Sequence, residues 1–411
     1  MEYNTKLTLR CCINNLELIW CHPKEKNIIM LFKNQILSAL SVLLMITLFS
    51  CSKTYTQEGL NVKTGKVINV GVYNGNGASP ICVLETMEAL KIDRGINPKE
   101  ISANDIMNGD LEKMDAIVFP GGSGSKEFNS LGQMAAEKVR EFGMKKDKGI
   151  VGICAGGYLL STTPTYENLK VLGVPHTRKY YDRGRGLIGF SLTGEGKKIF
   201  YELKNIDSLF VQYYDGPMFE STNGLNVLAT INTDIATHKG YPHNFTQGKP
   251  AFFTKKYGQG KVFVSVGHPE ATAGIRWIVP RMVRWVTNNK LISYSQDLIR
   301  PELNDKDILF YSDTKKLESK LFWQLSDKNP KKVLKAIKEL HKLRSRPSIR
   351  WSIGLLRHKD SDVRLTAARY LFDSEYTAAI PDLKAAVKSE RNEMLKNELQ
   401  AILTKMEGYV K

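Results

Sequence analysis

The sequence is poor in cysteine and lacks the patterns of several common site types. Six cysteines in 411 residues are too few for a scaffold built on disulfides. No cysteine pair has metal-ligand spacing and the seven histidines are scattered. The chain has no Gly-Lys-Ser/Thr segment of the kind that cradles nucleotide phosphates. We therefore expect neither a metal nor another cofactor.

Charge and hydrophobic content set broad limits on the class of protein. Hydrophobic residues make up 42% of the chain and charged residues 25%, which excludes a disordered chain. The 59 Lys and Arg exceed the 42 Asp and Glu, for a net charge of +17. Because the basic residues are spread along the chain and form no stripe, a nucleic-acid partner is not expected. The length suits two domains of roughly 100 to 200 residues with appendages.

The amino-terminal segment has the organisation of a sorting signal. Its uncharged apolar run, residues 36–49, is shorter than the roughly 20 residues that span a membrane. Leu48-Phe49-Ser50-Cys51 resembles the lipobox of bacterial lipoproteins, which implies lipidation of Cys51 and cleavage just before it. An uncleaved signal anchor is the alternative. The expected segments are residues 1–29 as an upstream extension that need not be translated, residues 30–51 as the signal peptide, and residues 52–64 as a polar tether.

The lipobox resemblance places the protein in the bacterial cell envelope. A lipid on Cys51 would hold the folded part at a membrane, facing the periplasm or the cell exterior. The membrane is then a partner through the lipid anchor.

From residue 65 onward, short β-branched runs alternate with amphipathic stretches. This alternation predicts a parallel sheet with helices on both faces, in which ligands bind at the carboxyl ends of the strands. Residues 170–255 are richer in Gly, Tyr and Thr and are predicted to add short antiparallel strands and loops at the sheet edge. The expected strands are residues 67–73, 116–119, 149–153 and 261–266, and the expected helices are residues 80–90 and 134–142.

Residues 301–411 contain few glycines and many Leu, Lys and Ala, which predicts a second, all-α domain. Residues 355–371 resemble a HEAT repeat, because an acidic turn precedes Val363-Arg364 and then small residues where helices would pack closely. Weaker neighbours at residues 333–343 and 394–403 predict a short solenoid. An irregular helical bundle is the alternative.

One cysteine lies in a turn suited to a nucleophile. The segment from Gly152 to Gly157 follows a predicted strand and precedes an apolar stretch, with Cys154 at its centre. Glycines two residues before and after this cysteine permit the tight strand-to-helix turn that exposes a nucleophile. The N–H groups of the following helix would lower the pKa of the thiol. A buried structural cysteine is the alternative interpretation.

Two further strand ends carry residues that such a nucleophile needs. His268 could take the thiol proton, and Glu270 could fix the tautomer of its imidazole. Gly121 and Gly122 could present backbone N–H groups to an oxyanion, with the N–H of Ala155 as the second donor. The alternatives are that His268 is a surface residue and that Gly121 and Gly122 form a plain turn. Three such segments at three strand ends nevertheless favour a single active site.

Together these segments resemble the class I glutamine amidotransferase-like superfamily. The closer resemblance is to the amidotransferase-like domain at the amino terminus of some biotin–protein ligases (BPL-N). It covers about residues 65–290, which we take as the first domain. The matching segments are residues 72–79, 119–122, 152–158, 213–217 and 268–270.

The resemblance implies a flavodoxin-like doubly wound parallel sheet and a Cys-His-Glu triad. On the matching positions it makes Cys154 the nucleophile, His268 the general base and Glu270 its orienting partner. It also places Gly121, Gly122 and Ala155 around the oxyanion.

Tyr158 is the chief departure from the family pattern. Relatives that hydrolyse glutamine usually carry Gln four residues after the nucleophile, where this chain has Tyr158. The 411 residues contain no synthetase, ammonia-accepting or biotin-ligase catalytic domain, so neither coupled glutaminase activity nor biotinylation is expected. The loop at residues 74–79 could form an anion-binding nest. Substrate contacts are therefore expected from Asn74, Gly75, Ser79, Tyr158 and Tyr214.

These observations leave two candidate functions. The first is a lipid-anchored thiol amidase or hydrolase that attacks a C–N bond of a small amide or peptide-like substrate through an acyl-Cys154 intermediate. The second is an inactive binding lipoprotein, whose cleft holds a ligand and whose HEAT-like tail recruits a protein partner. The complete triad favours the enzyme, whereas Tyr158 and the missing synthetase favour the binding protein.

Overall fold

The computed structural model describes residues 66–178, 184–235 and 243–410. The signal-peptide, lipobox and tether predictions, including lipidation of Cys51, lie outside these residues. Within the described ranges, no helix combines the length and the apolar character needed to cross a membrane.

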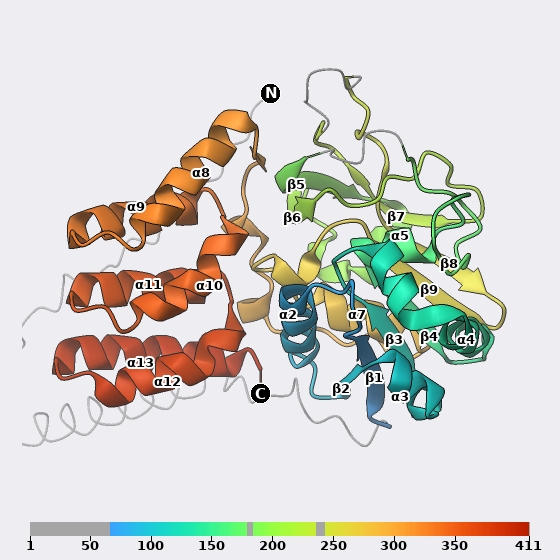
Figure 1. The fold of residues 1–411 in the computed structure, drawn as a ribbon, viewed down its shortest axis with the longest axis horizontal. Coiled ribbons are helices and arrows are strands. Elements are labelled where there is room, and N and C mark those ends of the chain that lie inside the picture. Colours follow the sequence, from blue (N-terminus) through green and yellow to red (C-terminus); the bar gives the residue numbers. More distant parts are fainter. Residues whose placement is uncertain (1–65, 179–183, 236–242, 411) are drawn as a thin grey trace, which may run out of the picture. The chain divides into compact units, whose positions relative to one another are not determined.

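A ten-stranded mixed sheet organises the α/β part (Figure 1). Its order is β10-β5-β7-β8-β9-β4-β3-β1-β2, with β6 paired to β5. The half from β9 to β2 is parallel throughout, which confirms the predicted doubly wound sheet. Its strands are β1 (Ile68–Tyr73), β2 (Ile96–Ile101), β3 (Ala116–Phe119), β4 (Gly149–Ile153) and β9 (Gly260–Ser265).

The other half of the sheet is antiparallel. It continues from β9 through β8 and β7 to β5, as expected for residues 170–255. β10 comes from residues that the sequence analysis assigned to the helical domain, yet it pairs with β5. The strands are β5 (Arg185–Leu192), β6 (Leu209–Tyr214), β7 (Asn226–Ile231), β8 (Pro250–Tyr257) and β10 (Ile308–Leu309).

β2, like β10, is a strand that the sequence pattern did not reveal. Its middle residues, Pro98, Lys99 and Glu100, are not buried, so no apolar alternation marks it. Among the described strands, β2 pairs only with β1 and forms the edge of the sheet, where a proline is tolerated because one side of the strand needs no partner.

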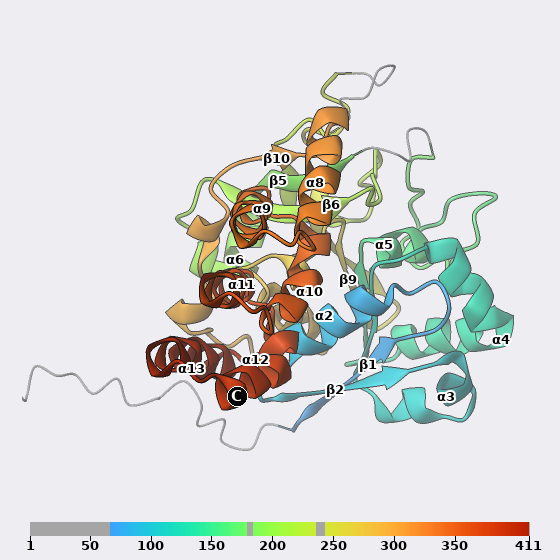
Figure 2. The ribbon, with the colours of Figure 1, turned by 60° about the vertical axis from the view of Figure 1, so that its left-hand side comes forward.

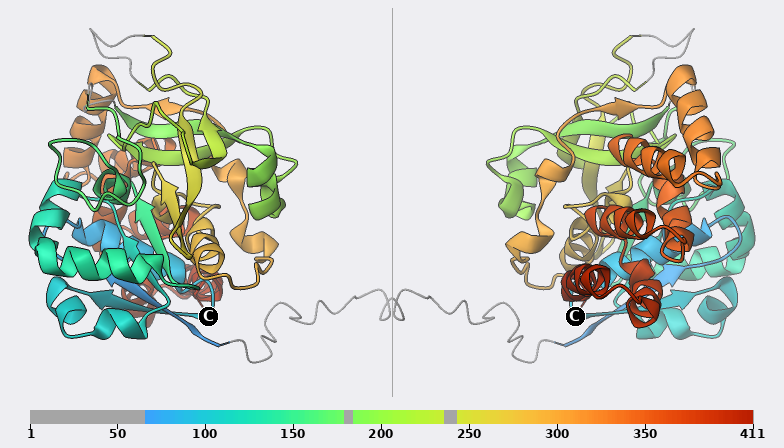
Figure 3. Two further views of the ribbon diagram at one scale, coloured as in Figure 1. Left: turned by 90° about the vertical axis from the view of Figure 1, so that its right-hand side faces the viewer. Right: turned by 90° about the vertical axis from the view of Figure 1, so that its left-hand side faces the viewer.

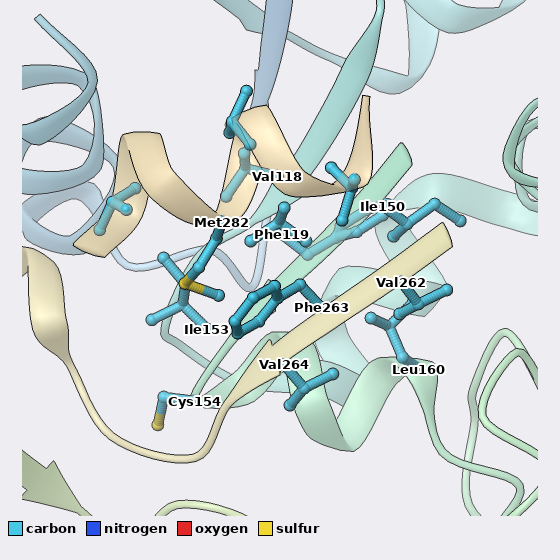
Figure 4. Close-up of a cluster of buried hydrophobic side chains, with 14 of the residues drawn as sticks. Val118, Phe119, Ile150, Ile153, Cys154, Leu160, Val262, Phe263, Val264 and Met282 are labelled. Atoms are coloured by element: carbon cyan, nitrogen blue, oxygen red, sulfur yellow. The ribbon is translucent and has the colours of Figure 1, made fainter. Parts of the chain in front are cut away.

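Helices cover both faces of the parallel half. α2 and α7 pack together on one face, and α4 and α5 pack together on the other with α3 beside α4. Figure 4 shows the buried side chains of β3, β4 and β9 between these layers, with Cys154 at the margin of the cluster. The helices are α2 (Pro80–Leu90), α3 (Ala103–Met107), α4 (Gly124–Met144), α5 (Ala155–Leu160), α6 (Gly194–Ile199) and α7 (Ile278–Val286).

The helical part consists of three stacked helix pairs (Figure 3). Asp360, in the predicted acidic turn, caps α11 by accepting from the backbone N–H groups of Asp362 and Val363. The small residues Ala367 and Ala368 are fully buried, which lets the helices approach closely. The helices are α8 (Ser312–Gln324), α9 (Pro330–Lys342), α10 (Arg346–Leu355), α11 (Ser361–Asp373), α12 (Ile380–Ser389) and α13 (Glu393–Gly408).

Glu375 joins the helical part to the α/β part, and both parts belong to one compact unit. Its buried carboxylate accepts from the Gly274 backbone N–H at 2.9 Å and from Arg300 Nη2 at 2.7 Å. Ile81 of α2 packs against the core of the helical part, and Figure 2 shows α2 beside α10 and α12.

Replacement of Glu375 by alanine should destabilise the protein strongly. We expect Glu375→Ala to lower the free energy of unfolding by about 3 kcal/mol, because it leaves Arg300 without its buried counter-charge. The matched control is Glu398→Ala, whose partner Arg369 lies on the surface, and which should cost no more than about 1 kcal/mol. Urea titration measures both values. Equal stability of the two variants would contradict the role given to Glu375.

Candidate active site

Cys154 lies in a strained turn between β4 and α5. Its φ of 49° and ψ of −102° lie in a region that non-glycine residues rarely adopt. The flanking glycines are required by close packing. A Cβ on Gly156 would lie 2.3 Å from the Phe119 carbonyl oxygen, and one on Gly152 would lie 2.9 Å from the backbone of Gly156. The sequence thus holds the Cys154 thiol at the carboxyl end of the parallel strands.

His268 follows β9, the neighbour of β4, and hydrogen bonds hold both its side chain and its backbone. Its Nδ1 lies 2.6 Å from Glu270 Oε1, and both side chains are buried. Its backbone N–H donates to the Gln212 carbonyl at 2.7 Å, and its carbonyl accepts from Thr272 Oγ1 at 2.7 Å. With Nδ1 engaged by Glu270, Nε2 is left for proton exchange with another group.

The pKa of His268 lies well above its usual value. Burial alone would lower it, but the negative charges of Cys154 and Glu270 outweigh that effect and raise the pKa. Arg346 acts in the opposite sense without reversing the shift. The arrangement therefore favours an imidazolium at neutral pH, the partner that a Cys154 thiolate requires.

A pocket of about 580 Å³ opens onto this thiol. Six residues expected from the sequence line it: Ser79, Gly122, Cys154, Tyr158, Tyr214 and His268. Eight others share the lining, half of them from α10: Ile81, Cys82, Arg185, Asp215, Arg346, Pro347, Arg350 and Trp351.

Of the remaining predicted residues, some lie next to the thiol or the imidazole, whereas Asn74 and Gly75 do not line the pocket. Gly121 lies against the imidazole, since a Cβ there would approach His268 Cε1 to 2.6 Å, and Ala155 begins α5 directly after the thiol. Glu270 lies behind His268. Asn74 and Gly75 do not line the pocket: the Asn74 side chain donates to Glu100 at 2.8 Å, and Gly75 is packed against Tyr73.

Two tyrosines form the wall beside Cys154. The Tyr158 hydroxyl lies 2.8 Å from the carbonyl oxygens of both Asp215 and Gly216, so it ties α5 to the loop after β6. The Tyr214 carbonyl oxygen lies 3.6 Å from Cys154 Sγ. Burial raises the pKa of Tyr214 to about 12, which keeps its phenol neutral.

Cys82 of α2 is a second thiol at the site that sequence reasoning did not assign. Its Sγ, an imidazole nitrogen of His268 and a carboxylate oxygen of Glu270 all lie within 4.8 Å of one another. Burial alone would raise the pKa of Cys82, but the charge of Arg346 and a hydrogen bond with His268 lower it overall. Its position after the first strand, at the same sheet edge, was the signal that could have revealed it.

Arg346 of α10 reaches this group of residues from the helical part. Its Nη2 lies 3.3 Å from Cys82 Sγ and 3.6 Å from Glu270 Oε1, and it also pairs with Glu85. Cys82, His268 and Glu270 are close enough together to hold one metal ion. The positive charge of the Arg346 guanidinium disfavours a metal cation at that position. No local pattern in the sequence indicates that Arg346 belongs to this site, because Arg346 lies in the helical domain, far along the chain from Cys154.

Comparison with protein families finds two matches. Residues 68–307 match the family described as "Biotin-protein ligase, N terminal", and residues 318–403 match "HEAT repeats". A biotin–protein ligase of Schizosaccharomyces pombe is 26% identical over 222 residues, which are 50% of this chain and 34% of that protein. The chain thus spans about a third of the length of this curated relative.

Similar solved structures include a glutamine amidotransferase and a glutaminase domain. One from Thermotoga maritima is 20% identical, with a TM-score of 0.37, and the match covers 52% of this chain and 82% of that one. The glutaminase domain of a Trypanosoma brucei CTPS is 11% identical with a TM-score of 0.38, covering 56% and 97%. A ThuA-like protein of Parabacteroides merdae is 10% identical with a TM-score of 0.41, covering 57% and 95%.

Removal of the Arg346 charge should shift the titration of Cys82. In Arg346→Gln the pKa of Cys82 loses its main lowering influence, so its alkylation profile should move to higher pH. Peptide mass spectrometry after iodoacetamide pulses between pH 5 and 9 measures the profile. The Arg346→Lys variant keeps a positive charge and should retain much of the wild-type profile.

The control for this experiment is Arg364→Gln, which removes an arginine paired to Glu390 within the helical part and away from the pocket. An unchanged Cys82 profile in folded Arg346→Gln, or an equal change in Arg364→Gln, would show that Arg346 does not act on the thiol.

Proposed function

Because the chain belongs to the family described as "Biotin-protein ligase, N terminal", which matches more than half of it, we propose that it is a thiol amidase or hydrolase acting on C–N bonds. The observation that carries this proposal is the strained Cys154 at the end of β4, in one pocket with His268, which is hydrogen-bonded to buried Glu270. Biotinylation is not proposed, since the match leaves two thirds of the yeast ligase uncovered.

The proposed reaction begins with attack of the Cys154 thiolate on an amide carbonyl carbon. A C–S bond forms, and the carbonyl oxygen becomes an oxyanion that backbone N–H groups near Gly122 and Ala155 would receive. The His268 imidazolium then gives its proton to the departing nitrogen, and the C–N bond breaks. The products of this step are a free amine or ammonia and an acyl-Cys154 thioester.

Hydrolysis of the thioester returns the enzyme to its starting state. Neutral His268 takes a proton from water, whose oxygen attacks the thioester carbonyl carbon. The C–S bond breaks, a carboxylic acid leaves, and the proton on His268 restores the thiolate–imidazolium pair. Glu270 keeps its hydrogen bond with Nδ1 and stabilises the imidazolium in both steps.

The proposal also includes the lipid anchor. Acylation of Cys51 would tether the α/β and helical parts to a bacterial envelope membrane, facing the periplasm or the cell exterior. The substrate would then be a small amide or peptide-like compound of that compartment, and the helical part could bring a protein partner.

The thiol reactivity of Cys154 tests the enzyme. The raised pKa of His268 favours an imidazolium beside Cys154, so the rate at which Cys154 reacts with iodoacetamide at pH 6.5 should depend on His268. His268→Ala should therefore react at pH 6.5 at least tenfold more slowly. Peptide mass spectrometry reads the rate at Cys154.

Two controls sharpen this test. Cys82→Ala removes the other thiol of the site, and His358→Ala removes a histidine of the helical part that does not line the pocket. If Cys154 reacts at the same rate in His268→Ala as in the wild type, the amidase proposal fails, and the inactive ligand-binding lipoprotein becomes the better description.

A further inference from the structure

The first two turns of α10 form one wall of the pocket that contains Cys154. Arg346, Pro347, Arg350 and Trp351 of this helix all line it. The amino-terminal end of a helix carries partial positive charge. The backbone of α10 therefore makes this wall electropositive, in addition to the charges of its side chains. The helical part therefore shapes the space that a substrate of the α/β part would occupy.

The arginine side chains that line the pocket differ in whether an acidic side chain lies beside them. Arg185 Nε lies 3.0 Å from Asp215 Oδ2, and Asp215 is the acidic residue of the lining. Arg346 is balanced by Glu85 and lies close to Glu270. Arg350 is exposed, and no hydrogen bond or ion pair of its side chain is found within the described ranges.

Trp351 gives the same wall an apolar surface. Its side chain is 58% exposed, and its ring meets that of Phe322 edge to face with centroids 5.0 Å apart. A substrate between Cys154 and α10 would thus meet a planar apolar side chain beside an unbalanced positive charge.

We propose that the substrate is an amide that also carries an acidic group, such as a carboxylate, and that Arg350 of the helical part binds this group. The inference rests on the proposed amidase function, which places the scissile bond at Cys154. The acidic group lies at the α10 wall, so Arg350 determines specificity, while Cys154 and His268 carry the chemistry.

Paired alkylating agents test this inference without knowledge of the natural substrate. Iodoacetate carries a carboxylate where iodoacetamide carries a neutral amide. The ratio of their rates at Cys154 reports anion preference, and it cancels changes in thiol reactivity. We expect Arg350→Gln to lower this ratio about threefold at low salt. Arg350→Lys should restore most of it.

Arg357→Gln is the matched control, because it removes a surface arginine of the same domain that does not line the pocket. Its ratio should equal that of the wild type. An equal ratio in Arg350→Gln and Arg357→Gln would overturn the inference. Failure of the amidase proposal is distinguishable, since it appears as an iodoacetamide rate at Cys154 that His268→Ala leaves unchanged.

A binding measurement covers the case in which Cys154 reacts too slowly. Succinamate is an amide with a carboxylate, and succinamide is its neutral counterpart. In Cys154→Ala, succinamate should bind about threefold more tightly than succinamide by ligand-observed NMR, and Arg350→Gln should remove the difference. Equal binding of the two compounds to Cys154→Ala would also overturn the inference.

Discussion

The hydrogen bond between His268 and Glu270 is the interaction on which the site depends. Both side chains are buried, and an ion pair kept from water is strong only when its geometry is fixed. Hydrogen bonds to Gln212 and Thr272 hold the backbone of His268 in place. This support keeps the imidazole in contact with Glu270 and at the pocket that contains Cys154.

The site contains two thiols around one histidine, and they differ in their surroundings. Cys154 lies in a strained turn that exposes it to the pocket, as a nucleophile requires. Cys82 lies on α2 within reach of Arg346, which favours its thiolate. In the proposed function, the backbone geometry therefore favours Cys154 as the nucleophile, while the charge of Arg346 lowers the pKa of Cys82.

The helical part contributes side chains to the pocket of the α/β part. It supplies Arg346 beside Cys82 and Glu270, and Arg350 and Trp351 at the pocket. Glu375 joins it to the α/β part through Arg300. Loss of this junction would open the pocket on one side, so the shape of the pocket depends on the helix stack.

Local sequence by itself determined the strands β1, β3, β4 and β9, the turn around Cys154 and the pairing of His268 with Glu270, because each depends on residues close together in the chain. It failed at β2, an edge strand without apolar alternation, and at Asn74 and Gly75, which follow a strand end but do not line the pocket. Only the tertiary structure decided that Arg346, Arg350 and Cys82 join the site. Their partners lie far away in the chain, and packing between domains leaves no periodic or local signal in the sequence.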